Sequence, residues 1–334
     1  MRLVVALGGN ALLRRDEPMT AEAQRANVQR AAAALAPLAR AHALVVTHGN
    51  GPQIGLLALQ QHAVTAGGPG ETQPPAFPLD VLGAQTEGMI GYLLAQALDD
   101  HLPPEKPVAS LLTRVRVDAA DPAFVHPTKF VGPGYADESV TRELARRHGW
   151  TFRRDGAAWR RVVPSPRPVE IVERPVLEIL LERGVTLICA GGGGIPVLRA
   201  EAQEQAAARA AGRTRGEVGI EAVIDKDHAS ALLAQNLAAD GLILLTDIAQ
   251  AQLGFGTDRA RGIRRASPEQ LAPLVAAEFP AGSMGPKIEA ACAFASATGG
   301  FAAIGALEDA VAVCEGRRGT RIERAAPRLE LEPT

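Results

Sequence analysis

Short apolar runs alternate along this chain with longer stretches rich in alanine and leucine. The runs are apolar at nearly every position, which is typical of strands buried on both faces of a sheet, and the longer stretches fit helices that cover it. The expected strands are residues 3–7, 43–47, 108–112, 185–189, 220–224, 242–246 and 301–304. The expected helices are residues 20–40, 54–66, 79–100, 174–183, 227–239 and 286–298. This alternation predicts an α/β protein with three αβα layers around an open, mainly parallel sheet.

The alternation breaks between about residues 114 and 168, where prolines, glycines, arginines and both tryptophans accumulate. We expect this part to be an inserted, protruding subdomain, with a helix over residues 137–148 and short strands within residues 151–163. A chain of 334 residues is long enough for one large α/β domain or for two lobes. The division expected here is an N-terminal lobe over residues 1–215, which carries the insertion, and a C-terminal lobe over residues 216–334.

The composition is that of an ordinary globular chain of 334 residues, with 47% hydrophobic and 22% charged residues. A formal net charge of −2 argues against nucleic acid or an anionic membrane as the main partner. No segment approaches the roughly 20 apolar residues needed to span a bilayer. The three cysteines are far apart, which excludes a disulfide framework and a CxxC zinc site and favours a reducing, cytoplasmic location. Residues 199–217 are rich in Ala, Arg, Gln and Glu and are expected to form a solvated excursion.

Four glycine clusters stand out, at residues 8–10, 49–51, 191–194 and 282–285. Glycines at the carboxyl end of a parallel strand let the backbone approach an anion, and the helix that follows offers unpaired N–H groups. Three of these clusters directly follow predicted strands, so the pattern predicts a phosphate or nucleotide site. The chain has no P-loop, no G-x-G-x-x-G after its first strand, no protein-kinase signature and no residues at metal-ligand spacing. We therefore predict no metal site built from protein ligands.

Lysine is rare in this chain, with four lysines among 35 basic residues. Three of the four, Lys129, Lys226 and Lys287, lie in compact motifs with Gly, Pro or Asp neighbours. An ammonium group is a point charge on a flexible stem, which suits contact with a phosphoryl group in transfer better than a planar guanidinium does. These lysines are therefore predicted to bind phosphate.

Six motifs together resemble those of carbamate kinases, which belong to the wider amino-acid kinase fold. They are residues 5–12 (VALGGNAL), 47–55 (THGNGPQIG), 189–196 (CAGGGGIP), 221–227 (EAVIDKD), 245–247 (LTD) and 282–287 (GSMGPK). The resemblance runs in register from residue 3 to about residue 320. It implies the amino-acid kinase type of open sheet, with carbamate bound by the N-terminal lobe and nucleotide by the C-terminal lobe. The implied reaction is reversible transfer of a phosphoryl group between ATP and carbamate, run toward ATP in catabolism.

The resemblance also implies roles for individual residues and for partners. The catalytic set is Lys129, Lys226, Asp227 and Lys287. The residues that bind carbamate or the phosphoryl group are Gly8, Gly9, Asn10, Gly49, Asn50 and Gly51. The residues that border the nucleotide are Gly191, Gly192, Thr246, Asp247, Ser283, Met284 and Gly285. Mg²⁺ is expected on phosphate oxygens and water, and the chain is expected to form a homodimer.

Several alternatives remain open from the residues themselves. Asp227 opens a predicted helix and could serve only as its N-cap, and Asp225 could serve only in a turn. Lys129 could act as a lid residue over the acceptor or simply pair with a carboxylate. The whole protein could instead be another kinase of this fold, acting on a small carboxylate or UMP, or a nucleotide-binding protein without catalytic activity.

Overall fold

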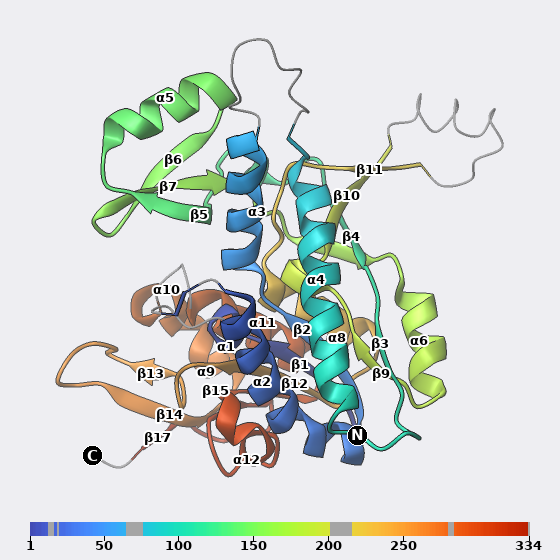
Figure 1. Cartoon of the computed structure of the whole chain (residues 1–334). Helices are drawn as coiled ribbons and strands as arrows, with labels where there is room; N and C mark the ends of the chain where they lie inside the picture. Colours follow the sequence, from blue (N-terminus) through green and yellow to red (C-terminus); the bar gives the residue numbers. More distant parts are fainter. Residues whose placement is uncertain (13–16, 19, 65–75, 201–215, 280–283, 333–334) are drawn as a thin grey trace.

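The computed structural model describes the chain except for residues 13–16, 19, 65–75, 201–215, 280–283 and 333–334 (Figure 1). A ten-stranded sheet crosses the molecule in the order β13-β14-β16-β15-β12-β1-β2-β9-β3, with β17 paired to β14. Its centre is parallel, as the apolar runs predict. The parallel strands are β1 (Arg2–Leu7), β2 (Ala43–His48), β3 (Val108–Ser110), β9 (Thr186–Ile188), β12 (Gly241–Thr246) and β15 (Phe301–Ala306).

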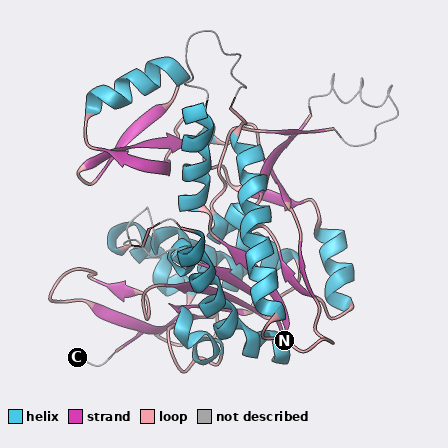
Figure 2. Ribbon diagram, viewed as in Figure 1, coloured by secondary structure: helices cyan, strands magenta, loops and turns pink. Residues whose placement is uncertain are grey.

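The central strands are apolar at nearly every position because helices cover both faces of the sheet (Figure 2). Successive side chains of β1 point to opposite faces, so Val4 joins one buried cluster and Leu3 and Val5 join the other. The first cluster includes side chains of α6 (Arg174–Glu182), α8 (Lys226–Asn236) and α11 (Met284–Thr298). The second includes side chains of α2 (Ala21–Ala41), α4 (Leu79–Asp99) and α12 (Ala310–Cys314). The predicted α/β class with three layers is confirmed.

Helix termini agree with the local signals in the sequence. Thr20 is the N-cap of α2, where its hydroxyl accepts a hydrogen bond from the N–H of Ala23 at 3.2 Å. Asp137 caps α5 (Glu138–His148), and Gly149 ends that helix in the left-handed conformation, with φ at 69°. Helix α3 (Gly51–Val64) begins directly at a glycine cluster. Among the described residues, no helix combines the length and apolarity needed to cross a membrane.

The interruption in the pattern corresponds to one small sheet and to two strands, β4 and β8, of a second one. One contains β11 (Glu217–Gly219), β10 (Ile195–Arg199), β4 (Arg114–Val117) and β8 (Pro168–Ile171). The other contains β5 (Lys129–Tyr135), β7 (Ala158–Val163) and β6 (Thr151–Asp155), and with α5 it projects at the upper left of Figure 1. The short strands expected within residues 151–163 and the helix expected over residues 137–148 are confirmed. The chain enters and leaves this projecting unit through the β4–β8 sheet.

The strand predicted over residues 220–224 is wrong. The paired segment is β11, which precedes it, and residues 220–225 form no regular ladder. The N–H of Val223 instead donates to the carbonyl of Pro164, at the base of the projecting unit, at 2.9 Å. Val223 and Ile224 are buried against other elements although they pair with no strand. Their apolar run therefore looked like that of a buried strand. Most of the excursion expected over residues 199–217 lies outside the described residues.

The C-terminal edge of the large sheet contains strands that the apolar pattern did not predict. These strands carry charged side chains on an open face, so they lack the continuous apolar signature of the central strands. They are β13 (Gln252–Leu253), β14 (Arg261–Ala266), β16 (Thr320–Ile322) and β17 (Glu330–Leu331). The remaining short helices are α1 (Gly9–Leu12), η1 (Pro122–Phe124), η2 (Gly191–Gly193), α9 (Pro268–Leu271), η3 (Ala272–Leu274), α10 (Val275–Glu278) and η4 (Leu307–Asp309).

Candidate active site

The first two glycine clusters meet at the carboxyl ends of β1, β2 and β12. The N–H of Gly8 donates to the carbonyl of Leu245 at 2.8 Å, and the N–H of Gly49 donates to the carbonyl of Leu7 at 3.0 Å. A Cβ atom on Gly49 would lie 3.1 Å from the backbone nitrogen of Gly9. The loops pack backbone against backbone, so a side chain at Gly49 would force them apart. This arrangement leaves main-chain groups facing the space above the sheet.

Helix α8 begins at the same edge, and its cap is Asp225. The side chain of Asp225 accepts a hydrogen bond from the N–H of Asp227 at 2.9 Å, which is N-cap geometry. The alternative that Asp227 serves as the N-cap is therefore wrong. Asp227 lies in the first turn of α8, where its carboxylate is free of capping and can face cations on neighbouring elements.

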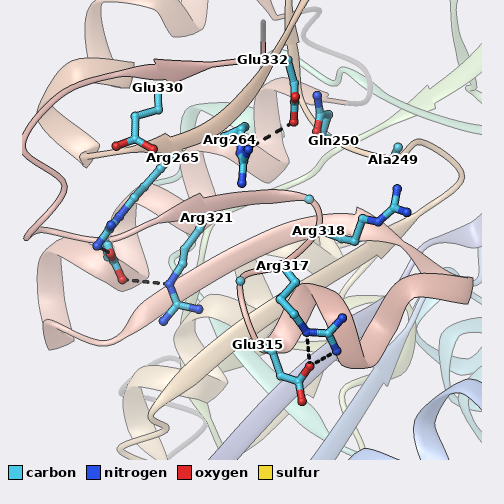
Figure 3. Close-up of a pocket in the computed structure, with 13 residues that line it drawn as sticks. Ala249, Gln250, Arg264, Arg265, Glu315, Arg317, Arg318, Arg321, Glu330 and Glu332 are labelled. Atoms are coloured by element: carbon cyan, nitrogen blue, oxygen red, sulfur yellow. Dashed lines mark hydrogen bonds and ion pairs between the residues drawn. The ribbon is translucent and has the colours of Figure 1, made fainter.

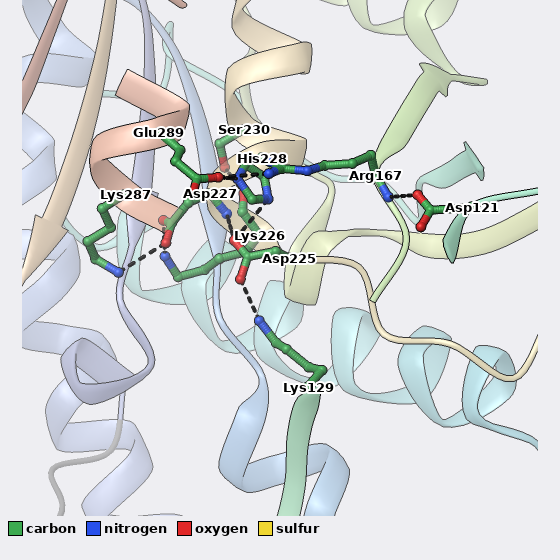
Figure 4. A network of polar contacts seen from close by, with 10 residues as sticks. All are labelled: Asp121, Lys129, Arg167, Asp225, Lys226, Asp227, His228, Ser230, Lys287 and Glu289. Atoms are coloured by element: carbon green, nitrogen blue, oxygen red, sulfur yellow. Dashed lines mark hydrogen bonds and ion pairs between the residues drawn. The ribbon is translucent and has the colours of Figure 1, made fainter. Parts of the chain in front are cut away.

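Three lysines and two carboxylates form one ionic cluster (Figure 4). Asp227 pairs with Lys226 and, at 3.0 Å, with Lys287 of α11. Lys129 of β5 pairs with Asp225 at 2.6 Å. The three lysines come from the projecting unit, from α8 and from α11, so the tertiary fold brings together positions 60 and 96 residues apart. Lys129 does pair with a carboxylate, as one of the two alternatives for it expected.

Burial makes this cluster electrostatically unusual. The side chains of Asp227 and Lys287 are only 5% and 9% exposed. Burial opposes ionisation of Asp227, but the two lysines outweigh it and lower the pKa of its carboxyl group. Burial also acts to lower the pKa of Lys287, and the charge of Asp227 overcomes it and raises that pKa, whereas for Lys226 burial prevails and the pKa falls. Three ammonium groups face two carboxylates, so the site favours an added anion.

A cavity of about 200 Å³ opens beside the cluster. Its lining includes Gly9, Gly49, Asn50, Gly51, Lys129, Gly192, Lys226 and Lys287. Asn50 is fixed because its amide donates to the hydroxyl of Thr86 at 2.9 Å, and that hydroxyl donates to the carbonyl of Gly83 at 2.8 Å. A Cβ atom on Gly192 would lie 2.1 Å from the amide nitrogen of Asn50. The cavity therefore presents backbone groups, one oriented amide and cations to a small ligand.

Glu87 is a site residue that the sequence analysis missed. It is buried on α4, and its carboxyl oxygens accept hydrogen bonds from the N–H groups of Gly191 at 2.9 Å and Thr113 at 3.1 Å. Burial raises the pKa of its carboxyl group to about 8. A signal was present in the sequence, because Glu87 shares a helix face with the apolar Ile90 and Leu94. Glu87 holds the third glycine cluster in place.

His48 packs against the glycine clusters at residues 49–51 and 191–194. Its ring is fully enclosed, and Nδ1 lies 3.1 Å from the carbonyl oxygen of Gly49. Burial lowers the pKa of this imidazole to about 4, so it is neutral at ordinary pH. A Cβ atom on Gly191 would lie 2.2 Å from Nε2 of His48. The role that follows from this geometry is structural support of the two loops.

The expected nucleotide residues fall into two places. Thr246 ends β12 and Asp247 follows it, and the hydroxyl of Thr246 donates to the carboxylate of Asp247 at 3.0 Å. Met284 and Gly285 begin α11. Gly191 and Gly192 follow β9, which is separated from β12 by β1 and β2, and Gly192 lines the cavity beside Asn50. Ser283 and the side chain of Asn10 lie outside the described parts of the chain.

A series of polar contacts extends from the ionic cluster to the segments that flank the projecting unit (Figure 4). His228 follows Asp227 on α8, and its Nε2 lies 3.4 Å from a carboxylate oxygen of Glu289 on α11. Glu289 also pairs with Arg167 at 2.7 Å, and the backbone N–H of Arg167 donates to Asp121 at 2.8 Å. These contacts join α8 and α11 to the segments that enter and leave the projecting unit.

A separate cavity of about 390 Å³ at the C-terminal edge of the sheet carries many arginines (Figure 3). Its arginines face glutamates, so the charges are largely balanced. Glu323 pairs with Arg265 and, at 2.9 Å, with Arg321, and Glu315 pairs with Arg317. This surface shares no residue with the lysine cluster, and we assign it no part in the chemistry.

Comparisons with known proteins agree with the resemblance in the sequence. The model of the amino acid kinase family matches residues 1–300. A carbamate kinase of Rhizobium meliloti is 53% identical over 96% of this chain and 93% of that protein. A carbamate kinase of Escherichia coli strain K12 is 46% identical over 96% of this chain and 98% of that protein.

Solved structures give the same result. Carbamate kinase from Giardia lamblia bound to AMP-PNP superposes with a TM-score of 0.82 at 38% identity, covering 96% of this chain and 98% of that one. A UMP kinase from Bacillus anthracis, at 12% identity and a TM-score of 0.53, shares the fold alone. The chain therefore belongs to the amino acid kinase family and, within it, to the carbamate kinases.

Proposed function

We propose that this chain transfers a phosphoryl group reversibly between ATP and carbamate, with carbamoyl phosphate and ADP as the products. The observation that carries the proposal is the pair of buried lysines, Lys226 and Lys287, held by Asp227 beside a cavity of about 200 Å³. Phosphoryl transfer needs alignment and neutralisation of oxygen charges more than covalent chemistry, and the cluster supplies both. The carbamate kinases among its relatives support carbamate as the acceptor.

The cavity is suited to the acceptor. Carbamate is small, flat and anionic, so its oxygen can attack without a general base to remove a proton. Backbone groups of Gly9, Gly49 and Gly51 and the amide of Asn50 line the cavity and would position it, and Gly192 lines the same cavity next to Gly191. We therefore assign Gly191 and Gly192 to the acceptor rather than to the nucleotide. We keep Gly8 and Asn10 as proposed parts of the acceptor site on the basis of the family resemblance.

The lysines would act on the oxygens of the transferred group. Lys226 and Lys287 balance the charge that moves between the acceptor and the nucleotide, and Asp227 keeps both ammonium groups in position. Lys129 reaches the cavity from the projecting unit, where Asp225 holds it at 2.6 Å. Movement of that unit would carry Lys129 toward or away from the bound substrate, which supports a lid role.

The nucleotide would lie on the C-terminal lobe, bordered by Thr246, Asp247, Ser283, Met284 and Gly285. Among the described residues, no group of three or more His, Cys, Asp or Glu side chains could hold a metal ion. Asp225 and Asp227 are both paired with lysines. We therefore expect Mg²⁺ to enter on the phosphate oxygens of the nucleotide as part of the substrate.

We also propose that the chain is a cytoplasmic homodimer whose N-terminal lobe, residues 1–215, binds the acceptor and whose residues 216–334 bind nucleotide. Support for the dimer comes from an apolar patch on α4, where Tyr92 is 56% exposed beside Met89. Leu112, which is 53% exposed, extends this patch because its side chain would touch a Cβ atom on Gly88 of α4. Such a patch is typical of a protein–protein contact. The physiological direction we propose is toward ATP.

The decisive experiment measures ATP formation from carbamoyl phosphate and MgADP. We expect the chain to form ATP and both Lys226→Ala and Lys287→Ala to reduce the rate by at least about 100-fold, because each removes a cation from the moving charge. Lys106→Ala is the matched control, since Lys106 donates to the carbonyl of His42 at 3.3 Å and does not line the cavity.

Two outcomes would contradict the proposal. A folded chain that binds ADP but forms no ATP from carbamoyl phosphate would overturn the reaction. Phosphorylation of acetylglutamate, aspartate or UMP in place of carbamate would move the chain to another activity of the fold. Full activity in the Lys226 and Lys287 variants would leave the reaction standing but refute this account of the site.

A further inference from the structure

A second cavity borders the projecting unit away from the candidate active site, and we call it the flank cavity. Its volume is about 480 Å³, and it shares no lining residue with the candidate active site. It lies between α3, the start of α4 and the β5–β7 sheet. The residues that decide its chemistry are Phe77, Phe124, Trp150, Arg161 and Glu221. A volume of this size is in the range of small-molecule sites.

Arg161 gives the flank cavity a cation that its surroundings satisfy poorly. Its guanidinium lies 4.1 Å from the centre of the Trp150 ring, and its side chain is only 14% exposed. Its buried Nε has no hydrogen-bond partner among the described residues. Its Nη2 forms an ion pair with Oε2 of Glu221 at 3.7 Å, which is beyond hydrogen-bond distance. A buried donor left unsatisfied costs free energy, and a guanidinium that turned toward a ligand acceptor would recover it.

Glu221 is shared between Arg161 and the start of α4. Its Oε1 accepts a hydrogen bond at 2.9 Å from the backbone N–H of Leu79, the first residue of α4. Pro78, the N-cap of that helix, provides no side-chain hydrogen bond, so Glu221 acts as the cap from a distance. Its Oε2 faces the guanidinium at 3.7 Å. A guanidinium has five N–H donors, so Arg161 can bind a second carboxylate beside Glu221.

The rest of the lining favours a ligand with an apolar, planar body. Phe77 is 53% exposed although it borders the cavity, and Phe124, Leu82 and Val163 also line it. Trp150 also lines the cavity, with the guanidinium of Arg161 over its ring. Aromatic side chains around one cation can bind the ring of a ligand while the cation binds its carboxylate.

The flank cavity and the active site share one strand ladder. Val163 of β7 lines the flank cavity and pairs in register with Lys129 of β5. Val162 likewise lines it and pairs with Phe130, which lines the active site. On the opposite wall, Glu221 precedes by four residues Asp225, the partner of Lys129. A ligand in the flank cavity would therefore touch both elements that position Lys129.

We propose that the flank cavity is a regulatory site for a small aromatic carboxylate, which binds Arg161 and thereby stabilises the position of Lys129 over the active site. The coupling to catalysis rests on the proposed role of Lys129, whereas the binding itself does not. Occupancy would restrain the projecting unit in the arrangement that pairs Lys129 with Asp225, and the Michaelis constant for carbamoyl phosphate would fall.

Binding can be measured without turnover through Trp150. The chain has two tryptophans, so Trp159→Phe leaves Trp150 as the single reporter inside the cavity. We expect phenylacetate to change its fluorescence saturably and neutral phenylacetamide to bind at least about tenfold more weakly. Arg161→Gln should weaken phenylacetate by at least about tenfold, while the control Arg153→Gln, an exposed position on β6, should leave it unchanged.

The outcomes separate this inference from the proposed function. The absence of a saturable fluorescence change up to about 10 mM phenylacetate would overturn the site. Equal binding of phenylacetate and neutral phenylacetamide would also overturn it, and that comparison does not depend on whether the Arg161 variant folds. Lys287→Ala, even if inactive, should bind phenylacetate normally. In the active chain, phenylacetate should lower the Michaelis constant for carbamoyl phosphate by about twofold or more. Competition between the two compounds would refute the existence of two separate sites.

Discussion

Replacing Asp227 with Asn tests the centre of the site, because it removes one charge and preserves the shape of the side chain. In the native chain this carboxylate is the shared partner of Lys226 and Lys287. At an effective dielectric constant of about 20, opposite charges 3.0 Å apart attract by about 5 kcal/mol. The desolvation of both ions offsets part of that attraction, and breaking a buried pair typically costs about 3–5 kcal/mol. We therefore expect Asp227→Asn to lose about 3 kcal/mol of stability.

The variant should lose more activity than its loss of stability explains. Without Asp227, two buried ammonium groups repel each other, their pKa values fall, and the lysines lose both position and charge. We expect the rate of ATP formation to fall by at least about 100-fold and to recover partly toward lower pH, where the lysines regain protons.

Urea unfolding at several pH values, run beside the rate assay, checks the reasoning. The folded-state pKa of Asp227 is lowered, so its contribution to stability is present above the pKa of the unfolded chain and is lost as pH falls through the folded value. The stability difference between native chain and variant should thus disappear in acid. Asp99→Asn, at an exposed position, is the control. A variant that unfolds with the native chain and keeps its rate within twofold would refute the reasoning.

Three further predictions concern the loops and the surface. Gly192→Ala should abolish most activity because its Cβ would lie 2.1 Å from the amide nitrogen of Asn50. The control Gly156→Ala, also at positive φ but with open space around it, should lower only stability. Reaction rates and melting temperatures of both variants check this. Because the folded pKa of Glu87 is raised to about 8, its contribution to stability is present below the unfolded pKa and lost as pH rises through about 8. The unfolding free energy of the native chain should thus fall over that range relative to Glu87→Gln, and parallel pH profiles would count against a buried carboxyl group. Tyr92→Glu should convert the proposed dimer to a monomer in light scattering, while Val176→Glu, an exposed apolar position on α6, should not; an unchanged mass for Tyr92→Glu would exclude the α4 patch as the interface.

Much of the site was predictable because it is encoded in short, local motifs. Residues 221–227 place Asp225, Lys226 and Asp227 at the start of one helix, and glycine clusters follow strands that the apolar pattern identifies. The prediction failed where the signal was ambiguous. Val223 and Ile224 are buried for packing reasons, so an apolar run was interpreted as a strand, and β14 was missed because its charged residues face an open side of the sheet.

The sequence by itself determined the α/β class, the order of the central strands and helices along the chain, and the chemistry of the loops, because periodicity, capping and glycine placement act over a few residues. The tertiary structure alone decided which charges meet. Lys287 pairs with Asp227 across 60 positions of the sequence, and Lys129 pairs with Asp225 across 96. Glu87 accepts a hydrogen bond from the N–H of Gly191, which is 104 positions away in the sequence. Such pairings depend on how the sheet twists and how helices pack on it, and no local pattern records those distances.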